Sequence, residues 1–336
     1  MQDTLSKIGM LPFKPLPLLS HGRTQTLAAR YFPFHSIITN NLHHIITLPC
    51  EDRIALIENR PSHWRPSKRI ILLVHGLSGS HLSSYMVRLA HHFLRAGCCV
   101  IRMNLRGCGS GAGLAQHLYH SGRSEDTRAV LAWLKQHYPD SPVTQIGFSL
   151  GGNITLKMAG EDGKMPSGNL DSVIAVSPPL DLAASVKLII HPKNRIFDAY
   201  FVNELRTEIK KIHQAFPTLP PVDLPKKLNL YDFDDLYTAP RSGFKNALDY
   251  YQRASSLQFI HNITIPTLIL YALDDPMINR SAFLRLPKQK NLEVIITKKG
   301  GHVGWLGKTD QFFNFRWMDR VLVKWGVWID EHANTI

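Results

Sequence analysis

The chain has 336 residues, of which 44% are hydrophobic and 19% are charged. This composition is that of a globular protein with one large domain or two ordinary ones, and it excludes a disordered chain. The formal net charge is +13, yet the longest basic runs are pairs such as Lys210-Lys211, and no zinc-finger spacing or aromatic-rich RNA-binding signature accompanies them. We therefore expect no nucleic-acid partner.

The sequence predicts neither a secretory leader nor a membrane span. The N-terminal stretch MQDTLSKIGMLPFKPLPLL carries Asp3, and prolines interrupt its short apolar segments. No run of 18 apolar residues occurs, which is the length that a transmembrane helix needs. Of the four cysteines, Cys98 and Cys99 fall in a predicted strand, so we expect buried thiols rather than a disulfide framework. We expect a cytoplasmic protein with at most peripheral contact with membranes.

Strand-like and helix-like segments alternate along most of the chain, which is typical of a mostly parallel sheet flanked by helices. Segments 43–49 and 53–59 predict an initial antiparallel pair. The apolar runs that predict the main sheet are 69–75, 98–104, 142–148, 172–178, 266–272 and 291–297. Helices are predicted over about 82–95, 125–138, 150–159 and 311–331. The last helix carries an apolar stripe of Trp317, Val321, Trp325 and Trp328, which we expect to pack in the core.

The alternation of strand-like and helix-like segments stops between residues 180 and 256. This segment is charged and helix-prone up to Phe216, and then rich in proline at 216–225 (FPTLPPVDLP). We expect a helical cap inserted over the strand ends, within a single α/β domain that spans residues 1–336. It contains many aromatic and aliphatic side chains. We expect some of them to pack on the sheet and the others to line an apolar substrate pocket.

The stretch TQIGFSLGGN (144–153) carries the motif G-x-S-x-G between a predicted strand and a predicted helix. A strand that turns directly into a helix strains the residue at the bend, so its neighbours at Gly147 and Gly151 must be small for the turn to close. In this setting the motif predicts a nucleophile elbow, which lifts the hydroxyl of Ser149 clear of the sheet edge.

An activated serine needs a histidine to take its proton and a carboxylate to orient that histidine. The α/β-hydrolase order is Ser, Asp or Glu, His, each in a loop after a strand. Asp274 and Asp275 follow the strand at 266–272, and His302 follows the strand at 291–297. Asp275 is the predicted partner of His302, because Pro276 stiffens the turn after it. Asp274 remains the alternative.

The oxyanion formed in such a reaction needs two hydrogen-bond donors. One predicted donor is the backbone amide of Leu150, directly after the serine. The other is the amide of Leu77 in the loop HGLSGS (75–80), which follows the strand at 69–75. We expect these two amides to form the oxyanion hole.

Other motifs predict no cofactor and no metal. The glycine-rich stretch RGCGSGAG (106–113) lacks the Gly-Lys-Ser/Thr ending of a phosphate loop and does not match the dinucleotide fingerprint. His117 and His120, with His91-His92, could suggest a metal, but no third ligand occurs at suitable spacing.

Taken together, HGLSGS, NLRGCGSG, GFSLGGN, YTAPRSGFKNALDYYQRAS, ALDDPM and GGHVGW resemble the YheT-like α/β-hydrolases, which are related to the ABHD1/ABHD3 group of mammalian hydrolases. The N-terminal HGRTQTL (21–27) also resembles that family's opening segment, so the likeness covers nearly the whole chain. The resemblance implies hydrolysis of carboxylic esters, with lipid-like or short-chain acyl substrates. In the family's pattern the aspartate before the Pro-hydrophobic pair acts, which corresponds to Asp275. The mammalian relatives carry a membrane anchor that this sequence does not show.

The sequence therefore predicts a serine carboxylesterase or lipase-like hydrolase that works through an acyl-enzyme on Ser149, His302 and Asp275. The expected partner is a small-molecule ester with an apolar short- to medium-chain acyl group or a lipid-like structure. An acyltransferase or thioesterase on the same triad, and a non-catalytic binding protein with this fold, are the alternatives. The sequence leaves the physiological substrate and the oligomeric state open.

Overall fold

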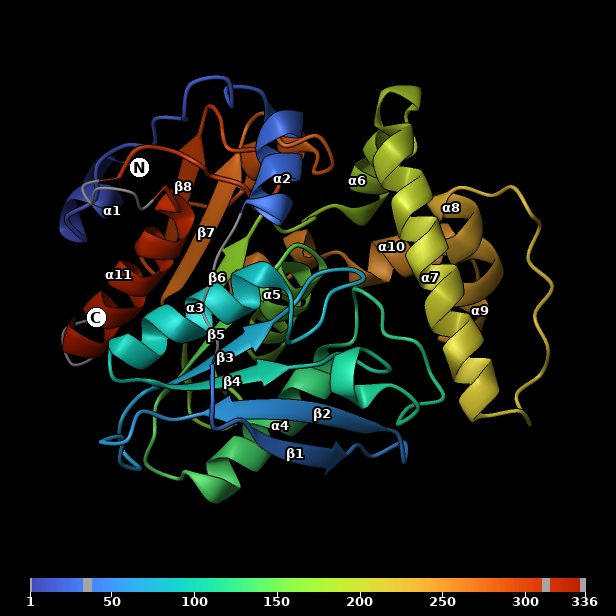
Figure 1. Ribbon diagram of the computed structural model, residues 1–336, viewed down its shortest axis with the longest axis horizontal. Helices are drawn as coiled ribbons and strands as arrows, with labels where there is room; N and C mark the ends of the chain where they lie inside the picture. The colour runs from blue at the N-terminus through green and yellow to red at the C-terminus, as the bar shows by residue number, and fades with distance from the viewer. Residues whose placement is uncertain (1, 33–37, 310–314, 333–336) are drawn as a thin grey trace.

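The computed structural model describes residues 2–32, 38–309 and 315–332, and its fold is an α/β sandwich around one sheet (Figure 1). The sheet has eight strands in the order β1-β2-β4-β3-β5-β6-β7-β8. The strands are β1 Leu42–Thr47, β2 Arg53–Asn59, β3 Ile70–Val74, β4 Cys99–Met103, β5 Val143–Phe148, β6 Leu170–Val176, β7 Thr267–Ala272 and β8 Leu292–Thr297. Every predicted strand is present, and the bounds agree with the prediction to within two residues.

Two kinds of strand pairing make up the sheet. β1 pairs with β2 and β2 with β4 in antiparallel fashion, whereas all other neighbouring strands are parallel. The antiparallel pair predicted at the start of the chain is therefore confirmed. The central strands β3, β4 and β5 are buried along their whole length, as expected of parallel strands with helices on both faces.

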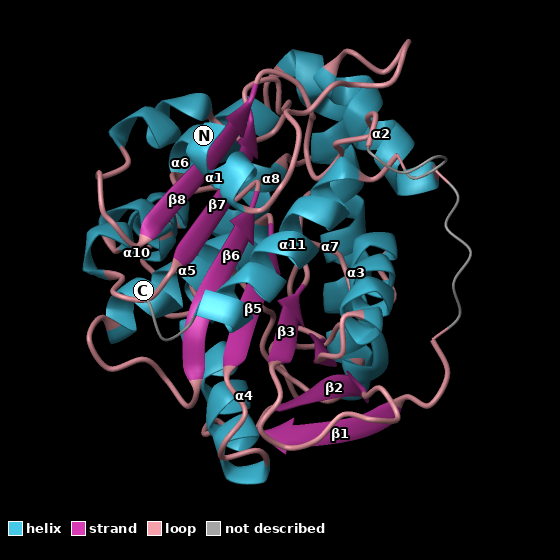
Figure 2. Cartoon of the chain, turned by 90° about the vertical axis from the view of Figure 1, so that its left-hand side faces the viewer, coloured by secondary structure: helices cyan, strands magenta, loops and turns pink. Residues whose placement is uncertain are grey.

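Helices cover both faces of the sheet, as the side view in Figure 2 shows. On one face, α3 (Ser84–Arg95) packs with α11 (Trp317–His332) and the short α1 (Gln2–Lys7) around a core that includes Phe93 and Trp325. On the other face, α4 (Ser124–His137) and α5 (Leu150–Asp162) pack on a second core. The predicted apolar stripe of the last helix is core, since Trp317, Val321 and Trp325 are buried and Trp328 is partly buried. The predicted start of this helix at Gln311 lies outside the described residues.

The segment 180–256 contains five α-helices, which gather at one side of the sheet, on the right in Figure 1. They are α6 Leu182–Ile189, α7 Arg195–Ala215, α8 Leu230–Phe233, α9 Ala239–Arg241 and α10 Ala247–Ala254. One π-helical turn, Asp234–Thr238, joins α8 to α9. The proline-rich stretch after α7 forms no helix or strand up to Leu230. We call this segment the insertion.

The helix α2 (Gly22–Tyr31) was not predicted from the sequence, and neither was α1. α1 has six residues, which is too short for a helical period to stand out. α2 begins with a glycine, and its N-terminal cap is His21, whose ring accepts from the amide of Arg23. Neither residue is a usual helix-start signal.

The parallel strands position the site. Because β3, β5, β6, β7 and β8 run in the same direction, the loops that follow them meet at one edge of the sheet. These loops carry Leu77, Ser149, the start of the insertion, Asp275 and His302 respectively.

Candidate active site

Ser149 occupies a sharp turn between β5 and α5. Its backbone has φ 52° and ψ −120°, a strained conformation for a residue other than glycine. A Cβ atom at Gly147 would lie 2.2 Å from the carbonyl oxygen of Gly151, and one at Gly151 would lie 2.5 Å from that of His75. Both positions therefore exclude a side chain, as the G-x-S-x-G motif requires.

The structure brings Ser149, His302 and Asp275 into one chain of hydrogen bonds. The Oγ atom of Ser149 lies 2.9 Å from Nε2 of His302, and Nδ1 of His302 lies 2.8 Å from Oδ2 of Asp275. A carboxylate only accepts hydrogen bonds, so the ring proton lies on Nδ1 and the lone pair of Nε2 faces the serine hydroxyl. All three groups come from different loops, after β5, β8 and β7.

Asp275 is held by the backbone that follows it. Its Oδ1 atom accepts from the amides of Met277 at 2.9 Å and Ile278 at 3.1 Å, and its side chain is fully buried. These contacts fix the carboxylate so that Oδ2 is presented to His302.

Asp274 has a different task, which the sequence did not reveal. Its Oδ1 atom accepts from the amide of Gly301 at 2.9 Å, directly before His302. Burial raises the pKa of Asp274. The amide of His302 itself donates to Oγ1 of Thr26 on α2, at 2.9 Å. Asp274 and Thr26 thus fasten the loop that presents the imidazole. The only signal for Thr26 was its place in the segment HGRTQTL.

Leu77 and Leu150, the two predicted amide donors, both line the cavity next to Ser149. Leu150 is the first residue of α5, where a backbone amide has no partner within the helix. The loop with Leu77 is braced by His75, whose Nδ1 contacts the carbonyl of Gly76 at 2.8 Å and whose Nε2 accepts from the amide of Leu105 at 3.0 Å. Burial lowers the pKa of His75 to about 4, so this brace is a neutral imidazole.

A cavity of about 70 Å³ opens above Ser149 and His302. Much of its wall comes from the insertion and is apolar. The apolar side chains that the insertion contributes include Val186, Ile189, Phe201, Leu205 and Leu230. Of the apolar side chains that the sequence suggested for the pocket wall, Ile189 and Phe201 line the cavity, whereas Ile196 is 75% exposed.

One ionisable side chain in the cavity wall was not predicted. Asp234, in the π-helical turn of the insertion, accepts a hydrogen bond from the hydroxyl of Tyr251 at 2.8 Å. Burial raises the pKa of Asp234 to about 6. A carboxyl group at this position adds negative charge to the wall near neutral pH, which disfavours an anionic substrate.

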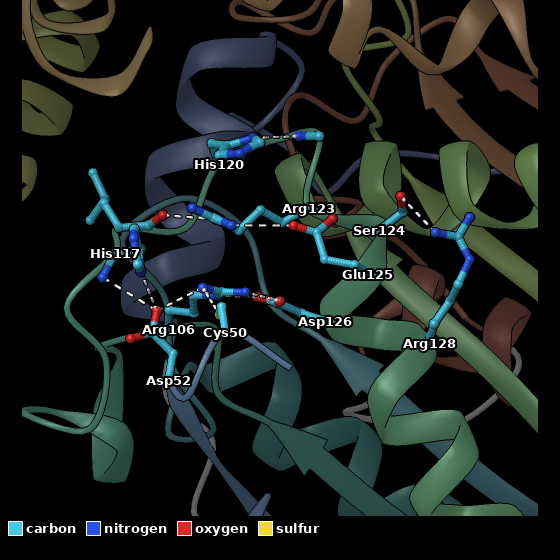
Figure 3. Close-up of polar contacts among 12 residues, drawn as sticks. Cys50, Asp52, Arg106, His117, His120, Arg123, Ser124, Glu125, Asp126 and Arg128 are labelled. Atoms are coloured by element: carbon cyan, nitrogen blue, oxygen red, sulfur yellow. Dashed lines mark hydrogen bonds and ion pairs between the residues drawn. The ribbon is translucent and has the colours of Figure 1, made fainter. Parts of the chain in front are cut away.

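A second polar cluster lies between Asp52, Arg106 and Asp126 (Figure 3). Cys50, Asp52 and His117 offer ligand atoms within 4.8 Å of one another. The oxygens of Asp52 already accept from Arg106 Nη1 at 2.6 Å and His117 Nδ1 at 2.9 Å, and from the amide of Gln116 at 2.8 Å.

In this cluster the guanidinium of Arg106 supplies the positive charge that a metal ion would bring. It lies 3.2 Å from Cys50 Sγ and binds Asp126 through two nitrogens. Burial raises the pKa of Asp126, against the pull of Arg106. His120 stays outside the cluster, with Nδ1 accepting from the amide of Gly122. We interpret the cluster as a buried ion-pair network.

A family model described as alpha/beta hydrolase fold matches residues 69–308. The chain therefore belongs to the α/β-hydrolase fold family, which agrees with its sheet and with the loops that carry Ser149 and His302.

Among individual proteins, the chain is similar to one of Escherichia coli named "Putative esterase YheT", with 30% identity over 88% of each chain. This similarity confirms the resemblance to YheT-like hydrolases. The chain is also 30% identical to a monoacylglycerol lipase of Saccharomyces cerevisiae, over 71% of this chain and 55% of that protein. An esterase of Pyrococcus furiosus has the same fold, with a TM-score of 0.56 and 17% identity over 87% of this chain and 92% of that one.

No helix in the described part of the chain is long and apolar enough to cross a membrane. The four cysteines are free thiols, and Cys98 and Cys99 are buried as predicted.

Proposed function

We propose that this α/β hydrolase is a serine esterase in which Ser149 is the nucleophile, His302 the general base and acid, and Asp275 the residue that orients His302. The observation that carries the proposal is the chain of two hydrogen bonds, 2.9 Å and 2.8 Å long, that joins these residues at the wall of an apolar cavity. Nucleophile and base lie at the distance that proton transfer requires.

The reaction begins when the Oγ atom of Ser149 attacks the acyl carbonyl and its proton passes to Nε2 of His302. The negative charge on the carbonyl oxygen is stabilised by the amides of Leu77 and Leu150. His302 then gives its proton to the leaving alcohol oxygen, and an acyl-enzyme remains on Ser149. Water, deprotonated by the same Nε2, attacks the acyl carbonyl; Ser149 leaves with the proton and the acid is released.

We propose apolar acyl esters of short to medium length as the substrate class. The names of the relatives, an esterase and a monoacylglycerol lipase, support an ester bond as the target. The cavity wall formed by the insertion supports an apolar acyl group, because each buried methylene contributes about 0.8 kcal/mol. The insertion serves as the cap of this pocket within a single domain. A small ester as the partner and a cytoplasmic location remain predictions.

Hydrolysis of a panel of p-nitrophenyl esters, with the acid product measured, tests the proposal. Wild-type protein should release p-nitrophenol and free acid in equal amounts, and Ser149→Ala should lose at least about 1,000-fold in kcat. Parallel acyl-CoA esters and added alcohols measure thioester cleavage and acyl transfer by the same residues. Equal turnover by Ser149→Ala and wild type would rule out the assignment.

A further inference from the structure

The loop that carries Leu77 is fastened by a side chain outside it. The amide of Ser78, the residue after Leu77, donates to the hydroxyl oxygen of Tyr119 at 2.8 Å. Ser78 has φ 56°, in the left-handed region that residues other than glycine rarely adopt. Such a backbone persists only where its surroundings hold it, and the hydrogen bond to Tyr119 holds the peptide unit between Leu77 and Ser78.

Tyr119 itself has little freedom. Only 2% of its surface is exposed, and its ring meets that of His75 edge-on, with 6.4 Å between centroids. It lines the same cavity as Ser149 and Leu77. The phenol therefore contacts the oxyanion loop (residues 75–80) at both its beginning and its middle, and it is not part of the Ser-His-Asp chain of hydrogen bonds.

A residue of the insertion, Glu208, also contacts the Tyr119 hydroxyl. Glu208 on α7 accepts from the hydroxyl of Tyr119, with 3.3 Å between Oε1 and the phenol oxygen. Its other oxygen, Oε2, is buried and has no hydrogen-bond partner among the described residues. An amide only donates, so the phenol proton is directed away from Ser78 and toward the Oε1 atom of Glu208, which accepts it. The lone pairs of the phenol oxygen are then left for Ser78.

Glu208 as a whole is partly buried, but its carboxyl group is turned inward and Oε2 is fully buried. Burial raises the pKa of Glu208 to about 7, and the nearby Glu204 raises it as well. The hydrogen bond from Tyr119 and the charge of Lys211 act in the opposite direction and lower it. The thiol of Cys108 lies 4.0 Å from Oε1. A buried carboxyl group with one oxygen unpaired destabilises a fold, so its presence at this place indicates a task other than stability.

We propose that Tyr119 is a positioning residue that fixes the Leu77–Ser78 peptide unit, and thereby the loop that presents the amide of Leu77 to the oxyanion, and that Glu208 orients the Tyr119 hydroxyl for this purpose. The insertion thereby contributes to transition-state stabilisation as well as to the pocket wall. The proposal rests on the serine-esterase function proposed above.

Three substitutions separate these roles. Tyr119→Phe removes the hydroxyl and keeps the ring, and Glu208→Met removes the acceptor. Both should lower kcat about 10- to 100-fold with KM changed less than about twofold, because the lost interaction matters mainly in the transition state. Glu208→Gln keeps an acceptor oxygen and should retain kcat within about threefold. A trifluoromethyl ketone, which forms an oxyanion on Ser149, should lose affinity in parallel with kcat.

Tyr138 provides the matched control. Its hydroxyl also donates to a buried glutamate, Glu58, at 2.9 Å and 3.0 Å, but Tyr138 directly follows α4 and Glu58 lies on β2, and neither residue lines the cavity. Tyr138→Phe should reduce stability and leave kcat unchanged. If Tyr119→Phe folds and keeps its kcat, or raises only KM, Tyr119 does not position the loop.

Glu208→Met tests the proposed role of Glu208 independently, and it does so even if Tyr119→Phe does not fold. Wild-type kcat in Glu208→Met, or an equal loss in Glu208→Gln, would overturn the role of its acceptor oxygen. Stoichiometric fluorophosphonate labelling of Ser149 should persist in all folded variants. Its absence from the wild type would instead refute the proposed function.

Discussion

The Oδ2 atom of Asp275 lies 2.8 Å from Nδ1 of His302, whereas its neighbour Asp274 turns to the amide of Gly301. Two adjacent carboxylates thus act on one loop in different ways. The first contacts the imidazole itself, and the second contacts the backbone that presents it.

We therefore expect unequal effects when each carboxylate becomes an amide. Asp275→Asn should lower kcat by about 10⁴-fold, because the amide stabilises the wrong tautomer of His302. Asp274→Asn keeps an acceptor oxygen for Gly301 and should lose less than about 10-fold. Steady-state kinetics on one p-nitrophenyl ester, with thermal unfolding as the control for folding, makes the comparison. A larger loss in Asp274→Asn would reverse the assignment.

The cavity wall predicts selectivity for apolar acyl groups. With p-nitrophenyl esters of increasing length, kcat/KM should rise by up to about fourfold per methylene while the chain is buried, and then fall when the cavity is full. Esters with a terminal carboxylate should be poor substrates, since Asp234 faces the same space.

Filling the cavity tests this selectivity. Val186→Phe should move the optimum to shorter chains, because Val186 lines the cavity. Leu248→Phe should not, because Leu248 is exposed on the insertion. A flat chain-length profile, or one that Val186→Phe leaves in place, would show that the insertion forms no acyl pocket.

Glu208 also predicts a pH dependence of stability. Its pKa is raised from 4.5 to about 7 on folding, so the folded state holds a proton that the unfolded state releases. The contribution of Glu208 to stability is full below pH 4.5 and is lost as the pH rises to about 7. Glu208→Gln does not titrate there. Its unfolding free energy should therefore rise relative to wild type by up to about 3 kcal/mol between pH 4.5 and pH 8.

Urea unfolding at the two pH values measures this difference between Glu208→Gln and wild type. Other titrating groups are common to both proteins and cancel. A difference that does not change with pH would contradict a carboxyl group whose pKa is raised by burial.

The network around Arg106 is predicted to be structural. Arg106→Met would leave two buried carboxylates, Asp52 and Asp126, without their cation, and should reduce the free energy of unfolding by about 3–5 kcal/mol. The exposed pair of Arg253 with Asp249 is the control, and Arg253→Met should reduce the free energy of unfolding much less, because solvent screens this pair. Similar losses in both variants would show that burial adds nothing to the Arg106 pairs.

The sequence predicted those parts of the fold that have local signals. Apolar runs marked each strand, and the glycines around Ser149 marked the turn after β5. Because parallel strands end at the same edge, their order along the chain also predicted that Ser149, Asp275 and His302 would lie together.

Other contacts had no local signal. The hydrogen bond from the His302 amide to Thr26 joins residues 276 positions apart, and that from Tyr119 to Glu208 spans 89. No periodicity or motif records which hydroxyl meets which amide, since such pairs depend on how α2 and the insertion pack. The carboxyl group of Asp234 in the cavity wall was hidden for the same reason, because a helical aspartate is ordinarily exposed.

The most direct test of the account is covalent labelling of Ser149. A fluorophosphonate should add once per chain to the wild-type protein, and peptide mass spectrometry should place the adduct on the peptide that contains Ser149. Ser149→Ala should remain unlabelled, and His302→Ala should react at least about 1,000-fold more slowly because the serine proton has no acceptor. An adduct on another residue, or equal labelling of Ser149→Ala, would contradict the central claim that Ser149 is the nucleophile.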